Sequence, residues 1–253
     1  MKIGICQYDA KWEDKESNKS RIEDLLEDCR GSRGIDWLIF PEMTLTGFTM
    51  NAGVAELDDS DRAFFRGLAA EYGFNVSYGG VEDGYNRLIT LDRSGNRVNA
   101  YSKIHLFAYG GEDKRYKPGG RQEVFELEGL RVVPAVCFDL RFPYLYWSMA
   151  PKADVYVTIA AWPAPRAEHW TTLLRARAVE NQAYCIGVDR VGKEGELEYS
   201  GNSACFDPLG RPVLDCGSSE GIFIADRPLD KALVAGTRER FPFIGERKDF
   251  PWR

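Results

Sequence analysis

Near its middle the chain carries the stretch Val132-Val133-Pro134-Ala135-Val136-Cys137-Phe138-Asp139-Leu140-Arg141-Phe142-Pro143. The apolar run up to Val136 is typical of a buried strand, and Cys137 stands where that strand has to turn. Pro143 suits the first turn of a helix, so the stretch predicts a strand, a tight turn and a helix. Hydrolases present a nucleophile on such an elbow, which makes Cys137 a candidate nucleophile. A lone cysteine at this place is more often inert core, and Cys137 therefore needs partners.

A shortage of histidine limits the catalytic sets that could activate this cysteine. The whole chain holds His105 and His169 and no other histidine. It has no Gly-x-Ser-x-Gly motif, two distant histidines make no metal-ligand set, and Gly119-Gly120 is too short for a phosphate loop. A serine triad, a metal site and a nucleotide cofactor are therefore not predicted. The base for Cys137 has to be another kind of side chain.

Outward from the elbow, the sequence alternates between strand and helix patterns. Apolar residues at helical spacing predict two helices, one through Ile22, Leu25, Leu26 and Cys29 and one over 61–72. Strands are predicted at 2–8, 37–40, 75–81, 86–92, 97–102, 154–161, 184–191 and 199–206, with a further helix over 167–182. A turn at 92–96 pairs two of these strands as neighbours, so we expect mixed sheets. The pattern indicates one α/β domain, residues 1–253, with helices covering at least one sheet and a second sheet for the surplus strands.

Composition argues against several classes of partner. The chain has 253 residues, of which 44% are hydrophobic, and its 33 Lys and Arg against 39 Asp and Glu give a formal net charge of -6. It has no basic stripe to neutralise a phosphate backbone, so nucleic acid is not an expected partner. The N-terminus is too polar for a secretory signal, no segment resembles a membrane span, and six cysteines show no paired short spacing. We therefore expect a cytosolic protein without membrane contact or a disulfide framework.

Two further reactive groups follow predicted strands. Glu42 comes after the apolar run 37–40 and Pro41. Apolar surroundings would disfavour its charge and suit it to general-base work, although solvated loop acids are common at strand ends. Lys103 has apolar and aromatic neighbours and could stabilise an oxyanion, or its side chain could simply extend to water. If strand alternation continues, Lys103 and His105 point the same way; His105 by itself is more typical of a hydrogen-bonded structural residue.

The coincidence of the three clusters favours catalysis. Ligand sites in layered α/β proteins gather at the carboxyl ends of strands, which is where Glu42, Lys103 and Cys137 are all predicted. Glu42 could take the thiol proton, and Lys103 could hold the oxyanion together with the backbone N–H of Phe138.

In this order the clusters resemble the motifs of the nitrilase superfamily of carbon-nitrogen hydrolases, whose members use a Glu-Lys-Cys triad. The resemblance spans nearly the whole chain and rests on Phe-Pro-Glu at 40–42, Ser-Lys-Ile-His-Leu-Phe at 102–107, Cys-Phe-Asp-Leu-Arg-Phe-Pro at 137–143 and Arg-Ala-Arg-Ala-Val-Glu-Asn-Gln at 175–182. It implies a second catalytic glutamate at Glu112, where neighbouring Asp113 offers the same chemistry. It also implies a four-layer α-β-β-α sandwich with two mixed sheets, commonly dimerised through helices.

Within the superfamily the chain most resembles the bacterial omega-amidase branch, which hydrolyses the terminal amide of 2-oxoglutaramate or 2-oxosuccinamate. This resemblance rests on the cysteine motif and on the segments 162–170, 180–184 and 238–242. It implies an amidase with a thioester intermediate on Cys137, in which Glu112 orients Lys103 or the attacking water. Hydrolysis of deaminated glutathione, an N-carbamoyl amine, an aliphatic amide or a nitrile is an alternative, as is a catalytically silent interaction module.

An omega-amidase has to hold the carboxylate of its substrate, and arginine is the natural bidentate partner. Arg166 is the candidate for this role. Arg141 lies nearer to Cys137, but for it we favour a structural ion pair with a buried acid. Trp162, Tyr109 and Phe142 are candidates for the pocket wall or for plain core.

The final segment, residues 238–253, holds Phe241, Phe243, Phe250 and Trp252 among charges and prolines. An apolar tail of this kind predicts docking on another surface. Under the resemblance, the tail is expected at or near the interface of a homodimer.

Overall fold

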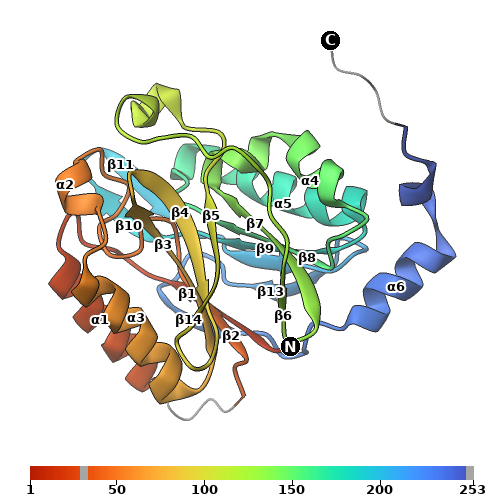
Figure 1. Ribbon diagram of the computed structural model, residues 1–253, viewed down its shortest axis with the longest axis horizontal. Coiled ribbons are helices and arrows are strands. Elements are labelled where there is room, and N and C mark those ends of the chain that lie inside the picture. The colour runs from red at the N-terminus through yellow and green to blue at the C-terminus, as the bar shows by residue number, and fades with distance from the viewer. Residues whose placement is uncertain (29–33, 249–253) are drawn as a thin grey trace.

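Two six-stranded sheets pack against each other in the computed structural model, which describes residues 1–28 and 34–248 (Figure 1). The first sheet has the order β14 (Gly221–Ile224), β1 (Ile3–Gln7), β2 (Trp37–Ile39), β3 (Asn75–Glu82), β4 (Tyr85–Leu91), β5 (Arg97–Ser102). The second has the order β13 (Pro212–Asp215), β12 (Ala204–Phe206), β9 (Tyr184–Val188), β8 (Val155–Ile159), β7 (Leu130–Val136), β6 (Phe125–Leu127). Both sheets are mixed, because β1, β2 and β3 run parallel, as do β7, β8 and β9, while the outer strands pair antiparallel.

Helices cover the outer face of each sheet (Figure 1). On the first sheet lie α1 (Lys15–Asp28) and α3 (Asp59–Tyr72), and on the second lie α4 (Pro143–Met149) and α5 (Ala167–Asn181). The remaining helical elements are α2 (Ala52–Ala55), α6 (Lys231–Arg240), η1 (Ala108–Gly110), η2 (Glu112–Lys114), η3 (Cys137–Arg141), η4 (Ala164–Arg166) and η5 (Phe243–Glu246). The predicted four-layer sandwich with two mixed sheets is confirmed.

Alternation of side chains along β2 explains why the layers stack in this way. Trp37 and Ile39 point into the core between the two sheets, where they join residues of β7 and β8. Leu38 and Phe40 point to the opposite face and pack with α1 and α3, for example against Phe65. A strand that is apolar on both faces is stable only between two apolar layers, and β2 is completely buried.

One predicted strand, 199–206, is in fact two strands in different sheets. β11 (Leu197–Ser200) forms a hairpin with β10 (Val191–Glu194), whereas β12 belongs to the second sheet. The chain turns between them at Gly201 and Asn202, which have left-handed φ angles of 67° and 56°. A Cβ at position 201 would lie 2.4 Å from the Gln7 side chain, so only glycine fits this close turn. Cys29, predicted on the first helix, lies outside the described residues.

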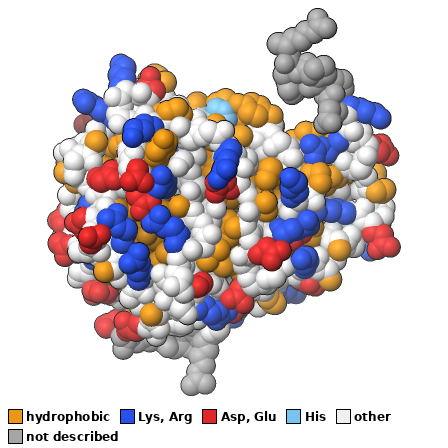
Figure 2. Space-filling model, viewed as in Figure 1, with side chains coloured by type: hydrophobic (Ala, Val, Ile, Leu, Met, Phe, Trp, Pro, Cys, Tyr) orange, Lys and Arg blue, Asp and Glu red, His pale blue; other side chains and the backbone are white. Residues whose placement is uncertain are grey.

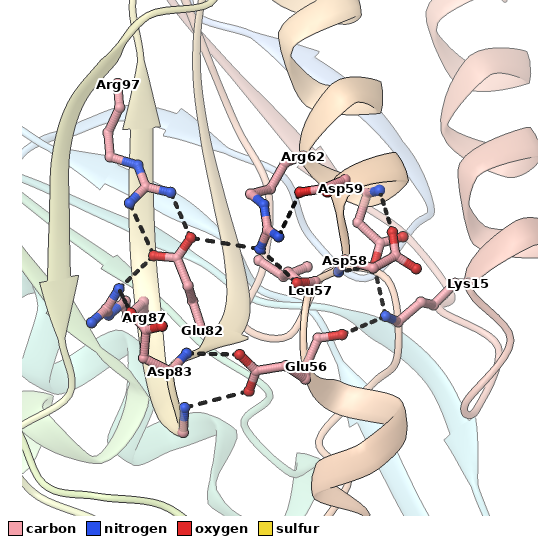
Figure 3. A network of polar contacts seen from close by, with 12 residues as sticks. Lys15, Glu56, Leu57, Asp58, Asp59, Arg62, Glu82, Asp83, Arg87 and Arg97 are labelled. Carbon is pink, nitrogen blue, oxygen red and sulfur yellow. Dashed lines mark hydrogen bonds and ion pairs between the residues drawn. The ribbon is translucent and has the colours of Figure 1, made fainter.

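A charged network fastens the helix layer to the edge of the first sheet (Figure 3). Glu82 on β3 accepts hydrogen bonds from Arg97, at 2.6 Å, and from Arg87. Burial alone would raise the pKa of Glu82, but these two guanidinium groups hold it below its usual range. Arg62 on α3 lies 3.8 Å from the same carboxylate and 2.9 Å from Asp59. The network therefore joins α3 to β3, β4 and β5.

The start of the predicted tail docks on its own chain. Arg238 donates to the carbonyl of Ala153 at 2.6 Å, and Gln182 donates to the carbonyl of Phe241 at 2.8 Å. Phe250 and Trp252 lie outside the described residues. On the face that Figure 2 shows, positive and negative side chains are interspersed. Within the described ranges, every helix is too short or too polar to cross a membrane.

Candidate active site

Three predicted groups meet where the two sheets adjoin. Glu42 follows β2 and Lys103 follows β5 in the first sheet, while Cys137 follows β7 in the second. The Nζ of Lys103 lies 2.8 Å from Oε1 of Glu42, and Cys137 is close enough to both side chains for their charges to affect the pKa of its thiol. Glu42, Lys103 and Cys137 are all buried. The carboxyl ends of strands from both sheets thus bring the three side chains together.

Lys103 lies between two carboxylates. Its Nζ is 2.8 Å from Oε1 of Glu42 and 2.8 Å from Oε2 of Glu112, and the Lys103 and Glu112 side chains are both fully buried. Burial alone would lower the pKa of Lys103, but the two carboxylates hold it above its usual value. The side chain therefore stays an ammonium at neutral pH. Asp113, the other acid that the sequence offered for this place, is exposed.

Asn86, which the sequence did not single out, joins the two carboxylates. Its amide Nδ2 donates to Glu42 at 2.7 Å and to Glu112 at 2.8 Å. Asn86 is fully buried on β4. Asparagine is depleted in strands, so an asparagine at the start of the predicted strand 86–92 was a signal that could have marked it.

The loop of Glu42 is pressed against β3. A Cβ at Gly79 would lie 2.7 Å from the Glu42 Cα and 2.5 Å from the Met43 nitrogen, so the approach requires glycine. The second carboxylate oxygen of Glu42 accepts a hydrogen bond from the Ala161 N–H at 2.9 Å. Three donors therefore face this carboxylate, and its surroundings are more polar than its sequence neighbours led us to expect.

Cys137 begins the predicted elbow with strained backbone geometry. Its φ is 47°, in the left-handed region, and 3₁₀ helix η3 and helix α4 follow, with Pro143 at the first turn of α4. Burial, followed by the charge of Glu42, raises the pKa of the Cys137 thiol, while Lys103 opposes the shift. The resting thiol is therefore neutral and needs a base. The Phe138 N–H lies in the first turn of η3, where helix N–H groups have no partner within the helix.

Asp139 ties this elbow to the segment that carries Lys103. One carboxylate oxygen accepts from the backbone N–H and the Nδ1 of His105, both at 2.9 Å; the other accepts from the Tyr101 hydroxyl at 2.9 Å and the Val136 N–H at 3.1 Å. Tyr101 and His105 flank Lys103 by two residues on either side. His105 is thus structural, and because β5 ends at Ser102, it does not share the direction of Lys103 as strand alternation predicted.

A cavity of about 390 Å³ opens beside Cys137. Its wall is largely apolar and is formed by Trp12, Phe48, Met50, Phe107, Tyr109, Gly110, Cys137, Phe138, Arg141, Ala161, Trp162, Pro163, Arg166, Glu194, Leu197 and Tyr199. Trp162 and Tyr109, for which the sequence left both wall and core open, line it. Phe142 does not; its ring stacks on His105 at a centroid distance of 3.6 Å. The β10–β11 hairpin, which the sequence pattern did not predict, supplies Glu194, Leu197 and Tyr199.

Both candidate arginines line this cavity. The ion pair with a buried acid that we favoured for Arg141 is not found among the described residues. Its guanidinium Cζ instead lies 4.5 Å from the ring centroid of Trp162, and its Nη2 lies 3.4 Å from Nδ1 of His169.

Comparison with known families agrees with this geometry. Residues 2–235 match the family model of the carbon-nitrogen hydrolases. The chain belongs to the carbon-nitrogen hydrolase family. The predicted resemblance, and the enzyme class that it implies, are confirmed.

Relatives of this carbon-nitrogen hydrolase match it over nearly their whole length. The omega-amidase YafV of Escherichia coli is 34% identical over 99% of this chain and 98% of its own. The 2-oxoglutaramate amidase of Bacillus subtilis is 32% identical over 98% of both. Among solved structures, XC1258 from Xanthomonas campestris is 33% identical to this chain, with a TM-score of 0.90 over 100% of this chain and 99% of its own. XC1258 is a CN-hydrolase superfamily protein whose structure has an arsenic adduct in the active site. An amidase from Nesterenkonia, in which acrylamide has added to the active-site cysteine, is 25% identical, with a TM-score of 0.81 over 96% of this chain and 98% of its own.

Proposed function

We propose that this carbon-nitrogen hydrolase is an omega-amidase. Its substrate would be a small 2-oxo acid amide, 2-oxoglutaramate or 2-oxosuccinamate, whose terminal amide it converts to the acid and ammonia. The observation that carries the proposal is the buried Lys103 ammonium, held by two carboxylates beside Cys137 at the edge of a small cavity. The names of the Escherichia coli and Bacillus subtilis relatives support the substrate class.

In the first half-reaction Cys137 is the nucleophile. Glu42 accepts the thiol proton as sulfur attacks the amide carbon, because the raised pKa of Cys137 leaves the thiol neutral until then. Lys103 and the Phe138 N–H stabilise the oxygen that becomes negative. Glu42 then gives its proton to the amide nitrogen, the carbon-nitrogen bond breaks, and ammonia leaves. An acyl group remains on sulfur as a thioester.

The second half-reaction returns the free thiol. Glu42 accepts a proton from a water molecule that attacks the thioester carbon, and the same two donors stabilise the new oxyanion. The carbon-sulfur bond then breaks and the proton returns to sulfur. Glu112 holds Lys103 in place throughout, and Asn86 fixes the separation of Glu42 and Glu112.

We further propose a homodimer that forms through the α5–α6 face. A groove there is lined by apolar side chains with large exposed fractions, Val179 at 46%, Leu233 at 37% and Phe241 at 66%. Exposed apolar surface of this kind is typical of a protein interface. Light scattering should give twice the chain mass for the native protein and the single mass for Phe241→Asp. Val98→Asp, at an exposed apolar site on β5, is the control and should remain dimeric.

A cytosolic location is also proposed. Cys137, Cys185, Cys205 and Cys216 are buried thiols outside any disulfide, which suits a reducing compartment.

Ammonia release from a panel of amides tests the substrate class. The panel contains 2-oxoglutaramate, deaminated glutathione, an N-carbamoyl amine, an aliphatic amide and a nitrile. The proposal expects the highest kcat/KM for 2-oxoglutaramate, and no release above background with Cys137→Ala. A higher kcat/KM for any other member of the panel would assign the enzyme to a different branch of the family.

A further inference from the structure

Two guanidinium groups in the cavity lack a carboxylate partner. Arg141 and Arg166 both line the cavity beside Cys137, and no ion pair to either is found within residues 1–28 and 34–248. The single acidic side chain in the cavity wall is Glu194, whose carboxylate is already paired with Arg190 at 2.6 Å. Burial, followed by the charge of Arg166, lowers the pKa of Arg141, as expected for two like charges near each other.

Aromatic rings hold the two arginines in place. The Cζ of Arg141 lies 4.5 Å from the Trp162 ring centroid, and the Cζ of Arg166 lies 5.8 Å from that of Phe107. The Trp162 indole N–H donates to the Arg166 carbonyl at 2.8 Å, so one tryptophan supports both arginines. A guanidinium that lies over a ring is attracted by it and keeps its N–H donors free for a ligand.

We infer that Arg141 and Arg166 together form an anion subsite that takes the carboxylate of the substrate. A carboxylate between them would supply the missing negative charge and accept the unused N–H donors of both groups. The inference deepens the proposed function and rests on it for the identity of the amide. It assigns Arg141 to substrate binding, a role for which the sequence favoured Arg166 alone.

The subsite restricts the substrate class. The amide carbon has to reach Cys137 while the carboxylate lies on the two arginines of the same small cavity. The substrate is therefore a monoamide of a short dicarboxylic acid, and an uncharged amide gains nothing from the subsite.

Kinetics on a charged and an uncharged amide of equal length test the subsite. Glutaramate, the monoamide of glutaric acid, carries the carboxylate, and glutaramide, the diamide, does not. Arg141→Met and Arg166→Met should each lower kcat/KM for glutaramate and for 2-oxoglutaramate by roughly 10- to 100-fold, as for a lost hydrogen bond to a charged group. Neither should lower it for glutaramide. The control is Arg121→Met, because the Arg121 side chain is 84% exposed and is not part of the cavity wall. This variant should change kcat/KM for neither amide. An equal loss on both amides, or no loss on glutaramate, would overturn the inference.

Binding to the inactive Cys137→Ala protein separates this inference from the proposed function. Calorimetry should show that Cys137→Ala binds glutaramate more tightly than glutaramide, and that adding either arginine substitution abolishes the difference. If the difference persists in both double variants, or is absent from Cys137→Ala itself, the subsite is wrong. If the difference is present but the native enzyme releases no ammonia from 2-oxoglutaramate, the subsite stands and the proposed reaction fails.

Discussion

Lys103 and Glu112 form an ion pair between two fully buried side chains, with the ammonium nitrogen 2.8 Å from the carboxylate oxygen. Glu42 binds the same ammonium from another direction at the same distance. The cation is thus surrounded by acceptors before any substrate arrives, and its task is to attract an oxyanion rather than to donate a proton. Its removal would leave two carboxylates close together without a cation.

Lys103→Met should therefore lose both activity and stability. Breaking a buried ion pair by removing one partner typically costs about 3–5 kcal/mol, and loss of an oxyanion donor lowers kcat by roughly 10²- to 10³-fold. Urea unfolding at neutral pH measures the first effect and ammonia release the second. The double variant Lys103→Met/Glu112→Gln should be more stable than Lys103→Met but equally inactive. If the single variant is as stable as the native protein, the description of this buried trio is wrong.

Asn86→Ala should lower kcat because the two carboxylates lose the amide that holds them together. The Asn86 amide makes one hydrogen bond to Glu42 and one to Glu112. Loss of the bond to Glu42 should misplace this side chain and lower kcat/KM by roughly tenfold or more. Asn86→Asp should be worse than Asn86→Ala, because it places a third negative charge against Glu42 and Glu112. Asn99→Ala is a matched control, since that amide donates to Glu123 outside the site. Equal kcat/KM values for Asn86→Ala and the native enzyme would show that Asn86 does not position the catalytic carboxylates.

Glu42→Gln should shift the titration of the Cys137 thiol to lower pH. The negative charge of Glu42 contributes to the raised pKa of this thiol, whereas Lys103 opposes it; neutralising Glu42 therefore favours the thiolate. Ultraviolet difference titration, with the corresponding Cys137→Ala protein as the blank, isolates this one thiol. Hydrolysis should nevertheless be lost, because no base remains for the water. A thiol that titrates at higher pH in Glu42→Gln would contradict the assigned contact.

Asp139→Asn should disturb the elbow and the Lys103 segment together. An amide at this position has one acceptor oxygen in place of two, so some of the donors from Tyr101, His105 and Val136 lose their partner. We expect a lower kcat with little change in KM, since Asp139 positions catalytic groups without lining the cavity. Asp92→Asn, at an exposed turn, is the control for a generally weakened fold. An unchanged kcat for Asp139→Asn would rule out this positioning role.

The sequence predicted those features that depend on local pattern. Glu42 and Cys137 could be placed at strand ends because apolar runs precede them, and Lys103 because it follows the predicted hairpin strand 97–102. Pro143 marked the start of α4. The features that depend on how distant segments pack could not be predicted. Asn86 and Asp139 act through partners on other elements, and a single sequence does not show which strands become neighbours.

Two local predictions failed for identifiable reasons. The apolar alternation at 199–206 concealed a turn at Gly201 and Asn202, where the chain passes from the β10–β11 hairpin to the second sheet. Phe142, for which the sequence left both pocket wall and core open, packs against the core with its ring stacked on His105. For Arg141, charge and burial suggested an ion pair, because nothing in the sequence shows that the nearest partners would be the rings of Trp162 and His169 and not an acid.

The most direct test of the central claim, that Cys137 hydrolyses the amide with Glu42 and Lys103, is the rate of ammonia release from 2-oxoglutaramate by the native protein and by folded Cys137→Ala. We predict steady release by the native enzyme and none above background by the variant, with unchanged circular dichroism. Release at the native rate by Cys137→Ala would contradict the account, as would the absence of release by the native protein.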